Sequence, residues 1–127
     1  SMAAPGRLAR VAKRCRIVDY AEVARRMMAK PTAEYRRFPC VLAGWDNSPR
    51  RPQGAFVLVE RDPRVYGEWL ANAIDRAAAL GSEPLVFINA WNEWAEGAYL
   101  EPCRRFGSRF LEATAAAVGR AESVRTD

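Results

Sequence analysis

Three stretches of the chain place an apolar residue at every third or fourth position, which is the period of an amphipathic helix. They predict helices over about residues 20–29, 63–80 and 108–120. Asp19 and Asp62 stand where a side chain can cap the first turn of the first and second helices. The side chains expected to face the core are Tyr20, Val23, Ala24, Met27 and Met28, then Tyr66, Trp69, Leu70, Ala73, Ile74 and Ala77, and finally Phe110, Leu111, Ala115 and Val118.

Three shorter apolar runs predict strands. Residues 38–43 (FPCVLA) and 85–90 (LVFINA) lack polar alternation, which is typical of strands covered on both faces in a parallel sheet. Residues 55–60 (AFVLVE) also favour a strand, which we expect at an edge outside the main sheet. Because strands and helices alternate along the chain, the order favours parallel pairing and an α/β fold.

Polar loops follow two of these strands at their carboxyl ends, where ligands gather in barrels and in open α/β sheets. GWDNSPRR follows residues 38–43, and WNEWAEGAYLEP follows residues 85–90. Glu93 and Glu96 are three residues apart, so in a helical turn their Cβ atoms are about 5 to 6 Å apart. A separation of about 5 to 5.5 Å is typical of the two catalytic carboxyl groups of retaining glycosidases. The spacing therefore permits paired acid–base chemistry.

Aromatic and hydrogen-bonding side chains accompany the two acids. Trp91, Trp94 and Tyr99 offer flat faces that suit sugar rings. They also lower the local dielectric, which favours one protonated carboxyl beside one ionised carboxyl. The other polar loop adds groups that match sugar hydroxyls or phosphates, namely Asp46, Asn47, Arg50 and Arg51.

Each of these features also has a purely structural interpretation, which the sequence leaves open. Glu93 and Glu96 also fit a solvated loop held by aromatic packing. Asp46 and Asn47 favour turns, because their side chains hydrogen-bond to the nearby backbone. The two arginines of the first loop also fit simple surface charges, and the Glu-Pro pair at 101–102 fits a loop end.

Composition narrows the possible chemistry. The 127 residues form at most one domain, half of them are hydrophobic, and no apolar run is long enough to span a membrane. The sequence has no histidine, which excludes Ser-His-Asp and Cys-His nucleophiles and histidine-ligated metals within this chain. Cys15, Cys40 and Cys103 are odd in number and widely spaced, which argues against disulfides and zinc and favours a cytoplasmic protein. We expect no cofactor and no metal.

The net charge of +5 comes from 20 Lys and Arg residues against 15 Asp and Glu residues. Positive charge is densest in a basic N-terminal segment, residues 1–18, whose start is interpreted as an expression remnant. Its basic residues are Arg7, Arg10, Lys13, Arg14 and Arg16. A solvated terminus is the favoured interpretation, although the cluster also suits phosphates or the inner membrane surface. Nucleic-acid binding is the weakest hypothesis, because no recognised motif accompanies the charge. Residues 121–127 are expected to form a frayed tail.

Two motifs carry a resemblance to a known family. FINAWNEWAEGAYLEP and FPCVLAGWDNSPRR resemble the WbsX-type lipopolysaccharide-biosynthesis glycosyltransferases, which are similar to the family-99 glycoside hydrolases, the endo-α-mannosidases. The resemblance covers about residues 19–118 and corresponds to the C-terminal third of such proteins. It implies a (β/α)8 barrel whose last strands are residues 38–43 and 85–90. About two parallel strands and three helices are too few to close such a barrel alone.

The resemblance also implies residue roles. Glu93 would take the proton from a sugar 2-hydroxyl, giving an anhydro-sugar intermediate and net retention, and Glu96 would protonate the leaving oxygen. Asn92 and Trp94 would orient the sugar and the acid. Cys103 stands where such proteins usually have an aspartate. The substrate-contacting residues that the resemblance implies are Trp45, Asp46, Asn47, Arg50, Arg51, Asn89, Trp91, Asn92, Trp94, Tyr99 and Glu101.

The resulting hypothesis is that residues 19–120 are a fragment of a carbohydrate-active enzyme that acts on glycosidic bonds of a bacterial surface polysaccharide. Hydrolysis and transfer use the same carboxylates, so the residues leave that choice open. The expected partners are an oligosaccharide, a second copy of the chain or a separate N-terminal barrel portion, and the isolated chain is expected to be inactive. The alternative is a non-catalytic glycan-binding module that keeps the aromatic and acidic loop.

Overall fold

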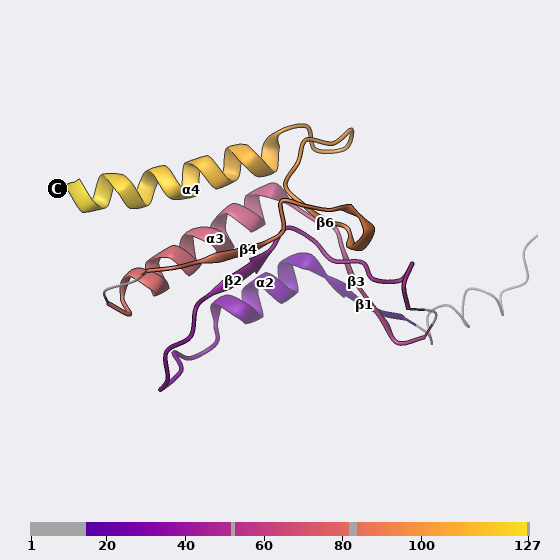
Figure 1. Cartoon of the computed structure of the whole chain (residues 1–127), viewed down its shortest axis with the longest axis horizontal. Helices are drawn as coiled ribbons and strands as arrows, with labels where there is room; N and C mark the ends of the chain where they lie inside the picture. Colours follow the sequence, from indigo (N-terminus) through magenta and orange to yellow (C-terminus); the bar gives the residue numbers. More distant parts are fainter. Residues whose placement is uncertain (1–14, 52, 82–83, 127) are drawn as a thin grey trace, which may run out of the picture.

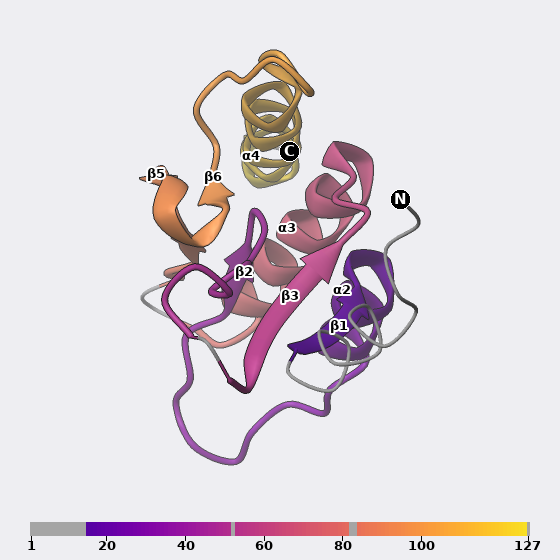
Figure 2. The same ribbon diagram turned by 90° about the vertical axis from the view of Figure 1, so that its right-hand side faces the viewer.

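The computed structural model describes residues 15–51, 53–81 and 84–126 as a mixed α/β fold (Figure 1). Helix α3 lies between α2 and α4, and short strands cover part of the helices (Figures 1 and 2). The elements in chain order are β1 (Cys15–Asp19), α2 (Tyr20–Met28), β2 (Cys40–Leu42), β3 (Ala55–Val59), α3 (Pro63–Ala78), β4 (Phe87–Asn89), β5 (Asn92–Glu93), the 3-10 helix η1 (Trp94–Glu96), β6 (Ala98–Tyr99) and α4 (Arg109–Thr126).

The longer strands form two parallel pairs. β2 pairs with β4 from Cys40 opposite Phe87 to Leu42 opposite Asn89, so the parallel pairing expected for the two apolar runs is confirmed. β3 pairs with β1, which places it outside the β2–β4 pair as expected. Among the described residues no sheet closes on itself.

Strand β1 is a correction to the sequence analysis. Residues 15–18 were assigned to a basic terminal segment, whereas they form a strand with Asp19 in register with β3. The sequence pattern did not predict this strand, because Arg16 interrupts its apolar residues. The partner strand is also distant in the sequence: Cys15 pairs with Ala55, 40 positions further along the chain. The other four basic residues of the cluster, at positions 7–14, lie outside the described residues.

The helix starts follow the capping signals. Asp19 Oδ1 accepts a 2.9 Å hydrogen bond from Glu22 N, and Asp62 Oδ1 accepts a 2.8 Å bond from Arg64 N. The ends differ from the prediction: α3 stops at Ala78, and α4 continues to Thr126. The expected frayed tail is therefore helical over residues 121–126, while residue 127 lies outside the described part.

Two tyrosines tie the helices to the rest of the core. Tyr20 is fully buried at the start of α2, and its hydroxyl donates a 2.6 Å hydrogen bond to the carbonyl of Leu42. Tyr66 of α3 is also buried, and its hydroxyl lies 3.0 Å from Thr114 Oγ1 of α4. Burial raises the pKa of both phenols, so they stay protonated and able to donate at neutral pH. No helix in the described ranges is long and apolar enough to cross a membrane.

Two expectations about burial were wrong. On α4, Phe110 and Ala117 are buried, whereas Ala115 and Val118 are exposed, because the helix turns a face of small residues toward α3. The run at 85–90 is not covered on both faces: Phe87 is 56% exposed, because β2 and β4 form only a two-stranded pair in the described residues.

Gly67 of α3 and Gly119 of α4 test this helix packing as a matched pair. A Cβ atom at Gly67 would lie 3.3 Å from the Cβ of Ala113, whereas one at Gly119 would meet no described atom within 4 Å. Gly67→Leu is expected to lower the free energy of unfolding by about 1–3 kcal/mol through overpacking. Gly119→Leu is expected to raise it by about 0.5–1 kcal/mol through helix propensity. Urea denaturation measures both, and a Gly67→Leu variant as stable as Gly119→Leu would contradict this packing.

Candidate functional site

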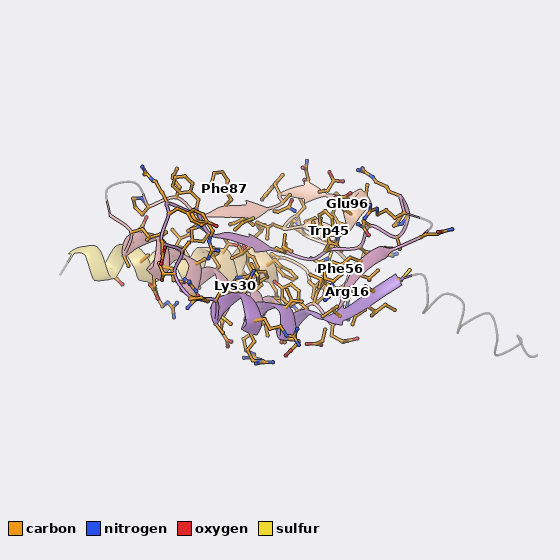
Figure 3. All side chains as sticks on the ribbon, turned by 90° about the horizontal axis from the view of Figure 1, so that it is seen from below. Arg16, Lys30, Trp45, Phe56, Phe87 and Glu96 are labelled. Atoms are coloured by element: carbon orange, nitrogen blue, oxygen red, sulfur yellow. The ribbon has the colours of Figure 1, made fainter. Side chains whose placement is uncertain are left out.

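The two polar loops meet at the carboxyl ends of β2 and β4. Ala43 N donates to Asn89 O at 3.0 Å and continues the strand pairing, and Asp46 N then donates to Glu96 O at 2.7 Å. Figure 3 shows Trp45 and Glu96 toward one end of the molecule and Phe87 toward the other. The prediction that both loops share one end of the strands is therefore confirmed.

The loop after β4 is an ordered hairpin. β5 and β6 pair antiparallel, with Asn92 opposite Tyr99, and the 3-10 helix joins them. Gly97 closes this turn at φ 61°, a left-handed conformation that suits glycine. The amides of Leu100 and Glu101 both donate to the carbonyl of Trp91, at 2.9 and 3.2 Å. The backbone thus sets where the two acids project.

Arg50 brings the two acids into one constellation. Its guanidinium lies 3.6 Å from Glu93 Oε1 and 3.4 Å from Glu96 Oε1. Because one side chain reaches both carboxylates, they project toward the same side of the hairpin. The side chain of Glu93 is 40% exposed and that of Glu96 is 19% exposed. Arg50 itself is 57% exposed, so the pairs are weak and a ligand can displace the guanidinium at modest cost.

An aromatic platform adjoins the acids. Trp94 stacks on Tyr99 with ring centroids 3.7 Å apart and planes 13° apart. The indole Nε1 donates a 2.6 Å hydrogen bond to Glu101 Oε2, which fixes the ring plane. Trp94 is 48% exposed although Tyr99 covers one face, so its other face is open to a planar ligand. Trp91 is 53% exposed.

The amide and carboxylate of the first loop shape the turn. Asp46 Oδ1 accepts from Ser48 N at 2.9 Å, and Asn47 Oδ1 accepts from Phe56 N at 2.8 Å. Asp46 therefore makes the local turn hydrogen bond of the structural interpretation, whereas the Asn47 side chain joins the loop to β3. The remaining sequence-predicted residues are half-buried (Trp45 and Asn89) or exposed (Arg51 and Asn92).

Arg61 connects the chain segments that carry the site, and the sequence analysis did not identify it. Its Nε donates to Ala43 O at 2.7 Å, and its Nη2 donates to Tyr99 O at 3.1 Å. The guanidinium carbon also lies 4.4 Å from the Tyr99 ring centroid and 4.8 Å from that of Phe110. One cation thus joins the end of β2, the hairpin and α4.

Gly44 is the sequence signal that could have revealed this contact. A Cβ atom there would lie 2.6 Å from Arg61 Nε and 2.6 Å from the carbonyl oxygen of Gly97. Glycine directly after a strand often marks such a close approach of another chain segment.

Cys103 lies beside this cluster, close to Tyr99 and Arg61. Burial acts to raise the pKa of its thiol. The amides of Phe106 and Arg105, the Tyr99 hydroxyl and the Arg61 charge outweigh burial, so the pKa lies below the usual value. The Phe106 amide donates to Sγ at 3.4 Å. In the described ranges, no three Cys, Asp or Glu side chains converge to hold a metal ion.

Comparison with known proteins adds to this geometry. Residues 3–114 match the family described as Glycosyltransferase WbsX. The chain is 44% identical over 113 residues to a protein named as the uncharacterized protein WxcX in two strains of Xanthomonas campestris pv. campestris, ATCC 33913 and B100. The match covers 87% of this chain but 16% of each relative. No solved structure matches the chain. The family match covers most of the sequence and includes both loops of the candidate site, so the chain belongs to the WbsX glycosyltransferase family.

Proposed function

We propose that this chain carries the acid–base pair of a carbohydrate-active enzyme that acts on glycosidic bonds of a bacterial surface polysaccharide. The observation that supports the proposal is the contact of Arg50 with both Glu93 and Glu96. A shared cation requires the two carboxylates to face one space. Most enzymes that break a glycosidic bond with retention use two carboxyl groups that flank the scissile bond.

In the proposed reaction, Glu93 removes the proton of the sugar 2-hydroxyl, and that oxygen attacks the anomeric carbon. The bond from this carbon to the leaving oxygen breaks, and Glu96 gives its proton to the leaving oxygen. Water or an acceptor hydroxyl then opens the anhydro sugar, returning a proton to Glu96 while the 2-oxygen takes back the proton held by Glu93. The greater exposure of Glu93 fits direct contact with a hydroxyl.

The proposed setting for this chemistry is a longer protein. The chain spans 16% of the length of its curated relatives, and each described parallel pair has only two strands. We propose that the remaining sequence supplies further strands of a (β/α)8 barrel around β2 and β4, and with them most of the sugar site. The isolated chain is then expected to be inactive, because two strands cannot enclose a substrate.

The exposed indoles favour one alternative, a module that binds glycans without turnover. Trp91 and Trp94 are each about half exposed, as sugar-stacking residues of binding sites need to be. Incubating the longer protein with oligomannose, and measuring both products and calorimetric binding, separates the two functions. Product formation supports the enzyme, and saturable binding without product supports the module. Absence of both would contradict a carbohydrate site for this substrate class.

A further inference from the structure

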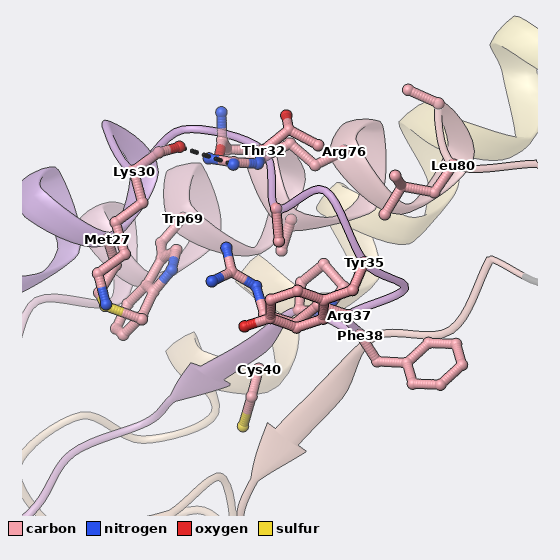
Figure 4. Close-up of a pocket in the computed structure, with 15 residues that line it drawn as sticks. Met27, Lys30, Thr32, Tyr35, Arg37, Phe38, Cys40, Trp69, Arg76 and Leu80 are labelled. Atoms are coloured by element: carbon pink, nitrogen blue, oxygen red, sulfur yellow. Dashed lines mark hydrogen bonds between the residues drawn. The ribbon is translucent and has the colours of Figure 1, made fainter.

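A cavity of about 530 Å³ lies at the opposite end of the strands from Glu93 and Glu96 (Figure 4). It is lined by the end of α2, the segment at 30–39 and the last turns of α3, and it is open to solvent on one side. Cys40, the first residue of β2, lines it, whereas the acids follow the last residues of β4. The volume falls within the range of about 300–1,000 Å³ that is typical of small-molecule sites. The cavity is therefore separate from the acid–base pair.

The charged side chains that line this cavity are positive. Lys30, Arg37 and Arg76 line it, and among the described residues no acidic side chain does. The one acid of the segment at 30–39, Glu34, is exposed and does not line the cavity. Three cations without a carboxylate make a cavity that attracts an anion.

Two of these cations have no described partner. The Arg76 guanidinium is fixed, because it donates to the carbonyls of Met28 at 2.9 Å and Lys30 at 2.7 Å. The Lys30 ammonium and the Arg37 guanidinium, by contrast, make no hydrogen bond or ion pair with any described residue. Both side chains are available for a ligand, and guanidinium groups match phosphate oxygens in geometry.

Aromatic side chains supply the apolar part of the wall. Trp69 is 4% exposed, held against Tyr20 by a ring contact of 6.1 Å, and it forms the floor beside Met27. Figure 4 shows the Arg37 guanidinium between Trp69 and Tyr35. Tyr35 is 69% exposed, so a flat ligand ring can pack on it while the charged group of the ligand meets the cations.

We propose that this cavity binds a nucleotide, with Lys30 and Arg37 holding its phosphate groups and the exposed ring of Tyr35 packing against its base. The inference is independent of the proposed function, because none of these residues contacts the acid–base pair. The two parts of the ligand make separate contributions: the cations require phosphate, and the aromatic wall requires a ring.

The cavity contains its own reporter. Cys40 lines it, whereas Cys103 lies outside it, beside Arg61 and Tyr99. The rates of iodoacetamide alkylation at these two thiols therefore compare a protected and an unprotected position. ADP is expected to slow alkylation of Cys40 and to leave Cys103 unchanged, as followed by mass spectrometry of proteolytic peptides, which separates Cys40 from Cys15 and Cys103. Adenosine or inorganic phosphate at the same concentration is expected to protect about tenfold less well, because each lacks one set of contacts.

Substitution of the two free cations completes the test. The double variant Lys30→Gln with Arg37→Gln is expected to raise the ADP concentration for half protection at least about tenfold. Both residues are exposed, so the fold should persist. The double variant Arg104→Gln with Arg105→Gln, also at two exposed positions, removes the same number of charges and is the control that leaves protection of Cys40 unchanged. The proposal fails if ADP does not protect Cys40, if it protects Cys103 equally, or if the double variant at Lys30 and Arg37 is protected like the parent chain. Equal protection by adenosine or by phosphate alone would also overturn it.

Discussion

Replacing Glu93 or Glu96 by glutamine, in the longer protein that contains this chain, is expected to lower the rate of glycosyl transfer or hydrolysis by about 10²–10⁴-fold. Glutamine keeps the size of the side chain and can still hydrogen-bond, but it cannot exchange a proton with the sugar. Both positions should be affected, because the proposed reaction uses one group as base and the other as acid. Product formation from oligosaccharide over time measures the effect.

Glu68→Gln is the matched control for this experiment. Glu68 lies on the exposed side of α3, where its carboxylate pairs with Arg64 at 2.6 Å. Its replacement is expected to leave the rate unchanged, which separates loss of the acid–base groups from a general loss of charge. Circular dichroism of each variant confirms that the helices persist. Unchanged rates in either of the two acid variants would refute the assignment of that residue.

Arg61→Leu is expected to produce the largest loss of stability among substitutions at a single charged residue, about 3–5 kcal/mol in the free energy of unfolding. The change removes two charge-assisted hydrogen bonds, to Ala43 O and Tyr99 O. It also removes the ring contacts with Tyr99 and Phe110 that join the hairpin to α4. Because the hairpin carries both acids, the site should loosen with the fold.

Arg64→Leu provides the comparison, and urea denaturation followed by tryptophan fluorescence measures both variants. Arg64 is three positions further along and 71% exposed, and its partners are the surface acids Asp62 and Glu68. Its loss is expected to cost less than about 1 kcal/mol. A similar loss for the two variants would mean that Arg61 does not join the three segments.

The helices could be predicted from the sequence because their signals are local. Asp19 and Asp62 cap the first turns within three residues of their own positions, and apolar periodicity marked most of the buried face of α3. The end of α4 was predicted less well. The helix is rich in alanine, which favours helix without forming a distinct apolar stripe. The apolar periodicity therefore ended before the helix itself ends at Thr126.

The parts that could not be predicted depend on contacts between distant segments. β1 is stabilised by its pairing with β3, and nothing in the sequence of Cys15–Asp19 indicates that partner. Arg61 resembles any surface arginine in the sequence, since its partners at Ala43 and Tyr99 are 18 and 38 positions away. The charge on a residue does not reveal which carbonyls it meets.

The candidate site was predicted in part. The spacing of Glu93 and Glu96 indicated that the acids share a side, and the position of both loops after strands indicated a common end of the sheet. The link between them, Arg50, came from the other loop, so its role as a bridge required the structure. Asp46 and Asn47 were predicted to contact the ligand, but the Asp46 side chain also forms the turn before Arg50, and the Asn47 side chain joins this loop to β3.

A crystal structure of the longer protein with a bound oligosaccharide tests the central claim most directly. The account predicts one sugar ring in contact with both carboxylates, Glu93 near its 2-hydroxyl and Glu96 near the glycosidic oxygen, with Arg50 beside them. A sugar bound elsewhere, with the two carboxylates directed away from each other into solvent, would contradict it.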